Sequence, residues 1–242
     1  MLRFKRRLAS MALSIFFVAA IAFAQTSTTP DQAKAAFTSN SAISNITLDG
    51  TFISTEGSLR QEGNAHLVAG SDGTYSVALT KSSGAAGEAR TRTDSDVGCT
   101  WQDARGNDHP VDWSNCQTPA WFLPELSLFL SSPPTAEWGL LAQNADVATP
   151  HLKFNYSSSG TTPSGKVPIR TALDLELSST TLLPSKATYF MHPDNHLNFN
   201  ILVQIVYQNY REISGVNIPF RIQKFVNGTL VLDITLNSAT VN

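Results

Sequence analysis

Apolar and polar residues alternate with a period of two in four segments of the last third of the chain. The alternation runs through residues 173–177, 199–207, 218–222 and 230–236. A period of two puts successive side chains on opposite faces of a strand, so each segment is predicted to be a half-buried strand. Asn227-Gly228 between the last two segments is a strong hairpin signal. The pattern predicts an antiparallel meander whose apolar face is covered either by curling of the sheet or by helices.

The region before this meander is predicted to hold one short helix and several more strands. Thr29, Pro30 and Gln32 supply a helix start, because Thr caps, Pro suits the first helical position and Gln completes a capping box. The helix is expected over residues 31–39. Strands are predicted over residues 46–52, 58–68, 74–80 and 91–97, and loops over residues 82–87 and 157–165.

Residues 1–24 have the pattern of a secretory signal peptide. Basic residues between Arg3 and Arg7 precede a mostly apolar run over residues 8–23, and Ala22-Phe23-Ala24 is a small-x-small cleavage signal. The apolar run is somewhat short for a bilayer span, and no stop-transfer charges follow it. We expect cleavage after Ala24 and a mature chain in the periplasm or outside the cell.

Residues 99–116 are predicted to form an aromatic hairpin that inserts between the two regions of strands. Trp101 lies on its first arm and Trp113 on its second, around a turn at residues 105–108. Cys99 and Cys116 are the two cysteines of the chain, and an even pair in an exported protein favours a disulfide. A disulfide across this loop would contribute about 3 kcal/mol. The alternative is a metal site, but two cysteines without a histidine at ligand spacing make a poor one, so no metal is expected.

A densely apolar stretch after the hairpin, residues 118–130, is predicted to be helical, with a kink at Pro124 because proline has no N–H. Its side chains either pack as ordinary core or line an apolar ligand cavity with the helix as its lid. Arg60, at the start of an alternating strand, is a candidate contact for the lid or for an anionic headgroup; the alternative is a solvated side chain. The candidate cavity and lid residues are Trp101, Trp113, Trp121, Phe122, Leu126, Phe129 and Leu130.

Composition limits the domain count and the partners. Removing the four cations of the signal peptide from 17 leaves 13 Lys and Arg against 19 Asp and Glu, so the mature chain has a net charge of −6. A mildly acidic surface argues against nucleic acid or an anionic membrane as the main partner. Residues 25–242 suffice for one core, and no linker divides them, so a single domain and a monomer are expected.

Common catalytic signatures are missing from the sequence. It has no Gly-x-Ser-x-Gly elbow, no His-Glu-x-x-His helix, no phosphate loop and no dinucleotide glycine fingerprint. His192 and His196 are four residues apart, but the residues between them predict a polar turn rather than a metal site. His109 lies among three aspartates, which favours an exposed acidic loop over acid–base chemistry. We therefore expect a protein without enzymatic activity, catalytic residues or cofactor.

The order of elements resembles the LolA/LolB-like periplasmic lipoprotein-carrier families. The likeness rests on Gln61-Glu62-Gly63 and the strand after it, on the Trp101 hairpin leading into an apolar helix, and on the end of the chain. There, residues 207–211, Gly215 to Pro219 and Asn227-Gly228 are similar to the terminal repeat of uncharacterised secreted proteins of this fold. The hairpin insert between the cysteines departs from the carrier pattern.

This resemblance implies an α+β, mainly β fold: an open antiparallel half-barrel with short helices packed on or plugging its concave face. It also implies reversible binding of acyl chains in the hollow, and an arginine near the early strands that holds the lid closed, for which Arg60 is the match. The preferred hypothesis is an exported protein that binds a lipid, an acyl chain or a lipoprotein, with a membrane-associated handover partner. The alternative is an envelope scaffold or interaction module with a self-filled core. A hydrolase would require a clustered His-Asp-Ser arrangement.

Overall fold

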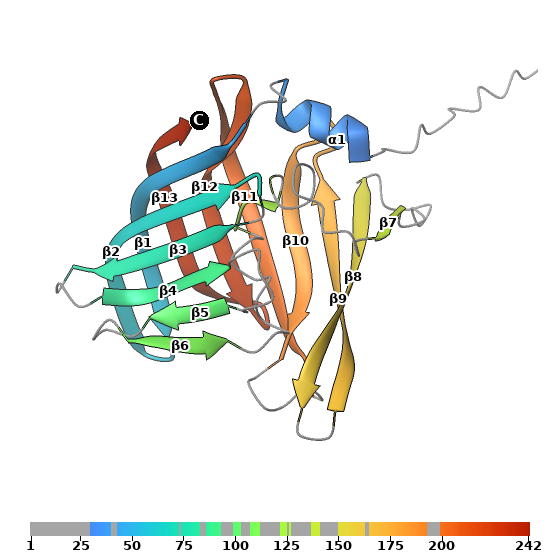
Figure 1. Cartoon of the computed structure of the whole chain (residues 1–242). Helices are drawn as coiled ribbons and strands as arrows, with labels where there is room; N and C mark the ends of the chain where they lie inside the picture. Colours follow the sequence, from blue (N-terminus) through green and yellow to red (C-terminus); the bar gives the residue numbers. More distant parts are fainter. Residues whose placement is uncertain are drawn as a thin grey trace, which may run out of the picture.

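The computed structural model describes residues 30–39, 43–72, 74–82, 86–92, 99–102, 107–111, 122–124, 126, 137–140, 150–162, 165–192 and 199–242. These residues form one antiparallel sheet and one short helix (Figure 1). The helix is α1 (Pro30–Phe37), and the strands are β1 (Asn45–Glu56), β2 (Leu59–Gly70), β3 (Tyr75–Lys81), β4 (Ala86–Arg92), β5 (Cys99–Gln102), β6 (Asp108–Val111), β7 (Glu137–Leu140), β8 (His151–Thr162), β9 (Gly165–Leu177), β10 (Pro184–Met191), β11 (Ile201–Ile213), β12 (Val216–Val226) and β13 (Thr229–Val241).

The sheet consists of two meanders that are joined by the first and the last strand. Its order is β6-β5-β4-β3-β2-β1-β13-β12-β11-β10-β9-β8-β7, so every neighbour is consecutive in sequence except the pair β1 and β13. β6 and β7 end this order at opposite edges, so the sheet stays open. The predicted class, a mainly β fold with an open antiparallel sheet, is confirmed. The helix predicted over residues 31–39 is α1, and most of the helix predicted over residues 118–130 lies outside the described residues.

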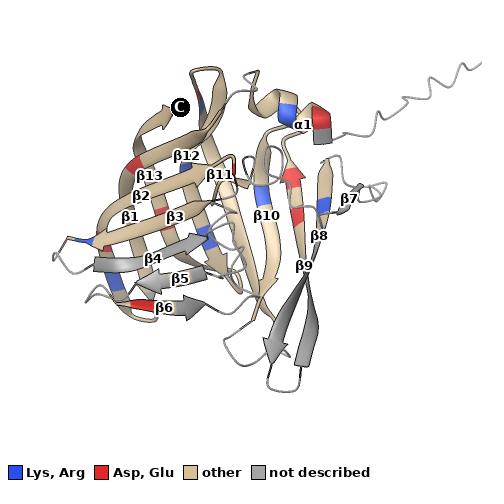
Figure 2. Cartoon of the chain, in the orientation of Figure 1, with Lys and Arg blue, Asp and Glu red and all other residues tan. Residues whose placement is uncertain are grey.

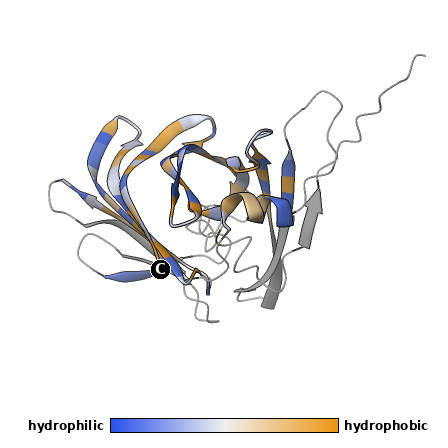
Figure 3. Ribbon diagram, turned by 90° about the horizontal axis from the view of Figure 1, so that it is seen from above, coloured by the Kyte–Doolittle hydropathy of each residue, from blue (hydrophilic) through white to orange (hydrophobic). Residues whose placement is uncertain are grey.

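Alternation along the strands produces one buried and one exposed face. On β11, Val203, Ile205 and Tyr207 are buried and alternate with more exposed residues, and Tyr207 is opposite buried Ile222 of β12. We call this buried side the inner face and the opposite side the outer face. Figure 3 shows the sheet curving from strands on one side of α1 to strands on the other. The inner face is therefore the concave side of the sheet, and the alternation predicted for the C-terminal strands is confirmed.

Helix α1 packs at the end of the inner face near the turn between β11 and β12. Ala33 and Phe37 of this helix are fully buried. Thr38 forms a bridge with Val216, and the side-chain amide of Asn217 donates to the carbonyl of Ala36 at 2.9 Å. These contacts fix the end of the helix against β12.

Two loops predicted from small polar residues are partly strand. Residues 157–162 continue β8 and pair with β9 up to Thr162 opposite Gly165, so the loop predicted over 157–165 is wrong. The loop predicted over 82–87 ends earlier, because β4 begins at Ala86. Serine and threonine provide no apolar alternation, but their backbones pair as well as any others. The Asn227-Gly228 hairpin is confirmed, and its residues have φ of 48° and 80°, as a type I′ turn requires.

Candidate functional site

The inner face is covered by side chains from α1 and from the connection between β6 and β7. In that connection, Phe122, Leu123 and Leu126 are buried, and Leu126 has no exposed surface. They belong to the same hydrophobic cluster as Phe37 of α1 and the inner-face residues of the strands. Among the residues that the structure describes, these side chains and those of α1 cover this part of the concave side.

The structure brings together two of the predicted cavity and lid residues. Phe122 and Leu126 both contribute to the apolar cluster. Trp101 lies on β5 opposite His109 of β6, so residues 99–102 pair with residues 108–111, but the side chain of Trp101 is outside the described part. Trp113, Trp121, Phe129 and Leu130 also lie outside the described residues, as does Cys116. The disulfide between Cys99 and Cys116 stays a prediction.

Arg60 lies away from the inner face. Ala65, Leu67 and Ala69 are the buried residues of β2, so alternation puts Arg60 on the outer face. Its guanidinium is 3.9 Å from the carboxylate of Glu62, and both side chains are about two-thirds exposed. Its assignment as a lid or headgroup contact remains a prediction that this position does not support.

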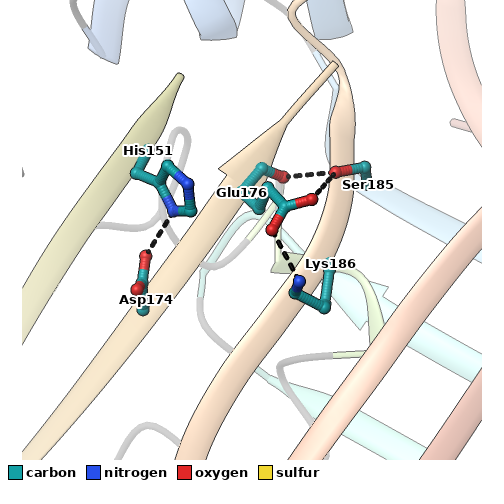
Figure 4. Close-up of polar contacts among 5 residues, drawn as sticks. All are labelled: His151, Asp174, Glu176, Ser185 and Lys186. Atoms are coloured by element: carbon teal, nitrogen blue, oxygen red, sulfur yellow. Dashed lines mark hydrogen bonds and ion pairs between the residues drawn. The ribbon is translucent and has the colours of Figure 1, made fainter. Parts of the chain in front are cut away.

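A polar cluster on the outer face of β8, β9 and β10 tests the hydrolase hypothesis (Figure 4). His151 Nδ1 lies 3.1 Å from a carboxylate oxygen of Asp174. Ser185 donates its hydroxyl to the backbone carbonyl and the carboxylate of Glu176, at 3.1 and 3.4 Å, and Lys186 pairs with the same carboxylate at 2.6 Å. The serine proton is directed at Glu176 rather than at the imidazole, so these residues do not form a nucleophile–base pair.

These contacts are ordinary cross-strand pairs of a solvated sheet face. The acidic residues of β9 lie beside basic residues of β8 and β10 (Figure 2). A second pair of the same kind joins His66 and Asp49 across β1 and β2, where Nδ1 and the carboxylate are 2.7 Å apart. Both pairs are exposed or half-exposed, and such pairs stabilise a sheet modestly. Among the described residues, no three His, Cys, Asp or Glu side chains gather as a metal site would require.

Another polar group of the outer face is centred on the carboxylate of Asp233 of β13, which accepts three hydrogen bonds. Arg221 donates two hydrogen bonds to its carboxylate, at 3.1 and 2.8 Å, and Gln223 donates a third at 3.0 Å. The hydrogen bonds from Arg221 lower the pKa of Asp233 below its ordinary value, against the opposing effect of partial burial. The same contact raises the pKa of Arg221. The charged form of Asp233 is thus favoured in the folded protein.

Replacement of Asp233 by Asn is expected to weaken folding near neutral pH by about 1 kcal/mol, because the carboxylate accepts charge-assisted hydrogen bonds at a half-exposed site. Since the pKa of Asp233 is lower in the folded state than in the unfolded state, its contribution is present above the unfolded pKa of about 3.9 and is lost as pH falls through the folded value. Urea unfolding of wild type and Asp233→Asn at pH 7 and at pH 3 measures the loss of stability at neutral pH and its dependence on pH. A difference between wild type and Asp233→Asn that grows towards pH 3 would contradict this assignment.

Comparison with known proteins found similar folds among solved structures, but no match at the level of sequence. No protein-family model matches the chain, and no curated protein matches its sequence. Within the part of the chain that the structure describes, no helix is long and apolar enough to cross a membrane.

Three solved structures have the same architecture. An outer membrane lipoprotein-sorting protein domain from Vibrio parahaemolyticus matches with a TM-score of 0.53 and 9% identity. A LolA superfamily protein from Nitrosomonas europaea matches with 0.50 and 10%, and a DUF1329 family protein from Desulfovibrio piger with 0.52 and 13%. Each match covers 88% of this chain and 91% of the other. The chain therefore has a LolA-like fold.

Proposed function

We propose that this protein is an exported, non-enzymatic carrier that binds the acyl part of a lipid or lipoprotein on the inner face of its sheet. The observation that carries the proposal is the cover of that face. Phe122, Leu123 and Leu126 are buried against it, and they belong to the connection between β6 and β7. A cover of this kind is exchangeable for a ligand of similar character.

The energies of the exchange support binding of a long acyl chain. Burial of one large apolar side chain contributes about 1.5–3 kcal/mol, so displacing the three cover residues costs on the order of 6 kcal/mol. Burial of acyl carbons contributes about 0.8 kcal/mol per CH₂, so a chain of about 16 carbons contributes on the order of 12 kcal/mol. Even with the cost of immobilising the ligand, a long chain competes with the cover and a short one does not.

The comparisons agree with a carrier of this class, since one structural neighbour is described as a lipoprotein-sorting domain and another as a LolA superfamily protein. Fold likeness alone does not fix function. The signal-peptide pattern of residues 1–24 adds a periplasmic or extracellular location. A monomer that receives acyl cargo and passes it to a membrane-associated partner fits these features.

Native mass spectrometry of the mature chain, residues 25–242, tests the proposal. The protein is exported during expression, so that its cysteines oxidise, and is sprayed under gentle conditions before and after incubation with palmitate. We expect an added mass that resolves into acyl lipid, in one-to-one stoichiometry. A protein that stays free of added mass, and that binds no hydrophobic dye saturably, would overturn the carrier assignment.

A second candidate is an envelope interaction module whose inner face is simply a core. The observation in its favour is that Phe122, Leu123 and Leu126 pack in one continuous apolar cluster with the inner-face residues of the strands. On this alternative, the cover never leaves. It predicts that a hydrophobic dye finds no saturable site in the folded protein.

A further inference from the structure

Charges are distributed unequally between the two faces of the sheet. Buried residues identify the inner face on the strands that have them, and pairing register extends this assignment to β4, β5 and β6, because paired residues point to the same face. All the strand carboxylates with described side chains occupy outer positions. They are Asp49, Glu62, Asp108, Asp174, Glu176, Glu212 and Asp233.

Cations, by contrast, occupy inner positions on three strands. Lys224 of β12 is opposite Ile205 of β11, which is fully buried. Lys81 of β3 follows Val77 and Leu79 in the same alternation. Arg211 of β11 is opposite Ile218 of β12. The charged side chains described at these inner positions are therefore all cations, although the chain as a whole carries a net negative charge.

Arg211 is the cation best placed to hold a ligand. Its guanidinium lies over the ring of Phe220, 4.1 Å from the ring centre, and Phe220 is buried on the inner face. No carboxylate of the described residues pairs with it, whereas Arg60, Lys186 and Arg221 on the outer face each have one. Stacking fixes the plane of the guanidinium and leaves its N–H groups for an oxyanion.

The place of Arg211 on the sheet joins this cation to the apolar surface. Its strand partner Ile218 is two residues from Val216, where Thr38 at the end of α1 forms its bridge. From Ile218, β12 continues through Phe220 and Ile222 to Lys224, roughly 20 Å along the strand. A charged group at Arg211 would thus lie at the α1 end of a continuous apolar path.

We propose that the ligand of the inner face is an anionic amphiphile, whose carboxylate or phosphate binds Arg211 while its acyl chain lies along β11 and β12. The inference rests on the proposed function and adds the charge of the ligand. A planar guanidinium binds either oxyanion through two parallel hydrogen bonds, and none of the carboxylates with described side chains lies on the inner face to repel it. A neutral acyl compound would gain the apolar contacts alone.

Binding of three ligands with the same sixteen-carbon chain tests the charge. Palmitate and hexadecyl phosphate are anionic, and hexadecanol is neutral; each is titrated as a competitor of a neutral fluorescent probe. We expect wild-type protein to bind both anions on the order of tenfold more tightly than the alcohol. The order of palmitate and hexadecyl phosphate identifies the oxyanion, carboxylate or phosphate, that the site prefers.

The variant Arg211→Gln should lose this preference and keep its affinity for hexadecanol, and Arg211→Lys should restore part of it. Arg60→Gln is the matched control, because it removes a cation from the outer face and should change neither affinity. Equal binding of anions and alcohol by wild type, or a preference that survives in Arg211→Gln, would overturn the inference and leave the carrier function standing. Failure of all three ligands to bind would instead overturn the carrier function.

Discussion

Replacement of Gly50 by Ala is expected to lower the free energy of unfolding by about 3 kcal/mol, one of the largest effects of a single methyl group in this protein. A Cβ at this position would collide with the carbonyl oxygen of Thr235 and lie 2.8 Å from the Cα of Leu236. Both obstacles are backbone atoms of β13, so no side-chain rotation relieves them. The register between β1 and β13 shifts here, from Asp49 opposite Ser238 to Gly50 opposite Leu236.

The cost is large because this pair of strands joins the two meanders. Relief of the collision would require β1 and β13 to move apart, and no other strand pair connects the two halves of the sheet. Urea unfolding of Gly50→Ala against wild type measures the effect. Gly57→Ala is the matched control: Gly57 has φ of 62° but nothing within 4 Å of the added carbon, so about 1 kcal/mol is expected. Equal destabilisation by the two variants would show that the steric argument is wrong.

Strands that bury one face and expose the other could be predicted from the sequence, because burial of one face makes apolar and polar residues alternate. Residues 203–207 and 232–236 alternate strictly, and both lie in central strands. The sequence did not predict the strand over residues 157–162, where serine, threonine and glycine supply backbone pairing without an apolar signal. Nor did it indicate that β1 pairs with β13, since pairing between the two ends of a chain depends on the whole sheet and leaves no local pattern.

Part of the candidate site was predicted from the sequence. The two arginines were not told apart, because the face that each one takes depends on whether it is an odd or an even number of residues from a buried position on its strand. Phe122 and Leu126 were found because a dense apolar run predicts burial, and both are buried. Arg60 was singled out from its place at a strand start, yet it is five residues from buried Ala65 and so takes the outer face. Arg211 is four residues after buried Tyr207 and takes the inner face. Counting residues from the nearest buried position of each strand would have favoured Arg211 over Arg60 as the inner-face cation.

Replacement of Leu126 by Ala is expected to weaken folding and strengthen ligand binding together. Leu126 is fully buried in the apolar cluster, so its truncation should lower the free energy of unfolding by about 2–3 kcal/mol. If the cover must leave the inner face before an acyl chain enters, the same loss lowers the cost of opening. The affinity for palmitate should then rise, by up to about 30-fold for 2 kcal/mol.

Leu175→Ala is the matched control for Leu126→Ala, because it removes a buried leucine from the inner face rather than from its cover. Leu175 is also fully buried, but it belongs to β9 and is part of the inner face itself. Its truncation should cost a similar free energy of unfolding while leaving palmitate affinity equal or lower, because the ligand loses a contact. Opposite changes in affinity for two equally destabilised variants distinguish a displaceable cover from a general loosening of the core. If Leu126→Ala binds palmitate no better than wild type, then Leu126 does not compete with the ligand, and a core filled permanently by its own side chains becomes the better account.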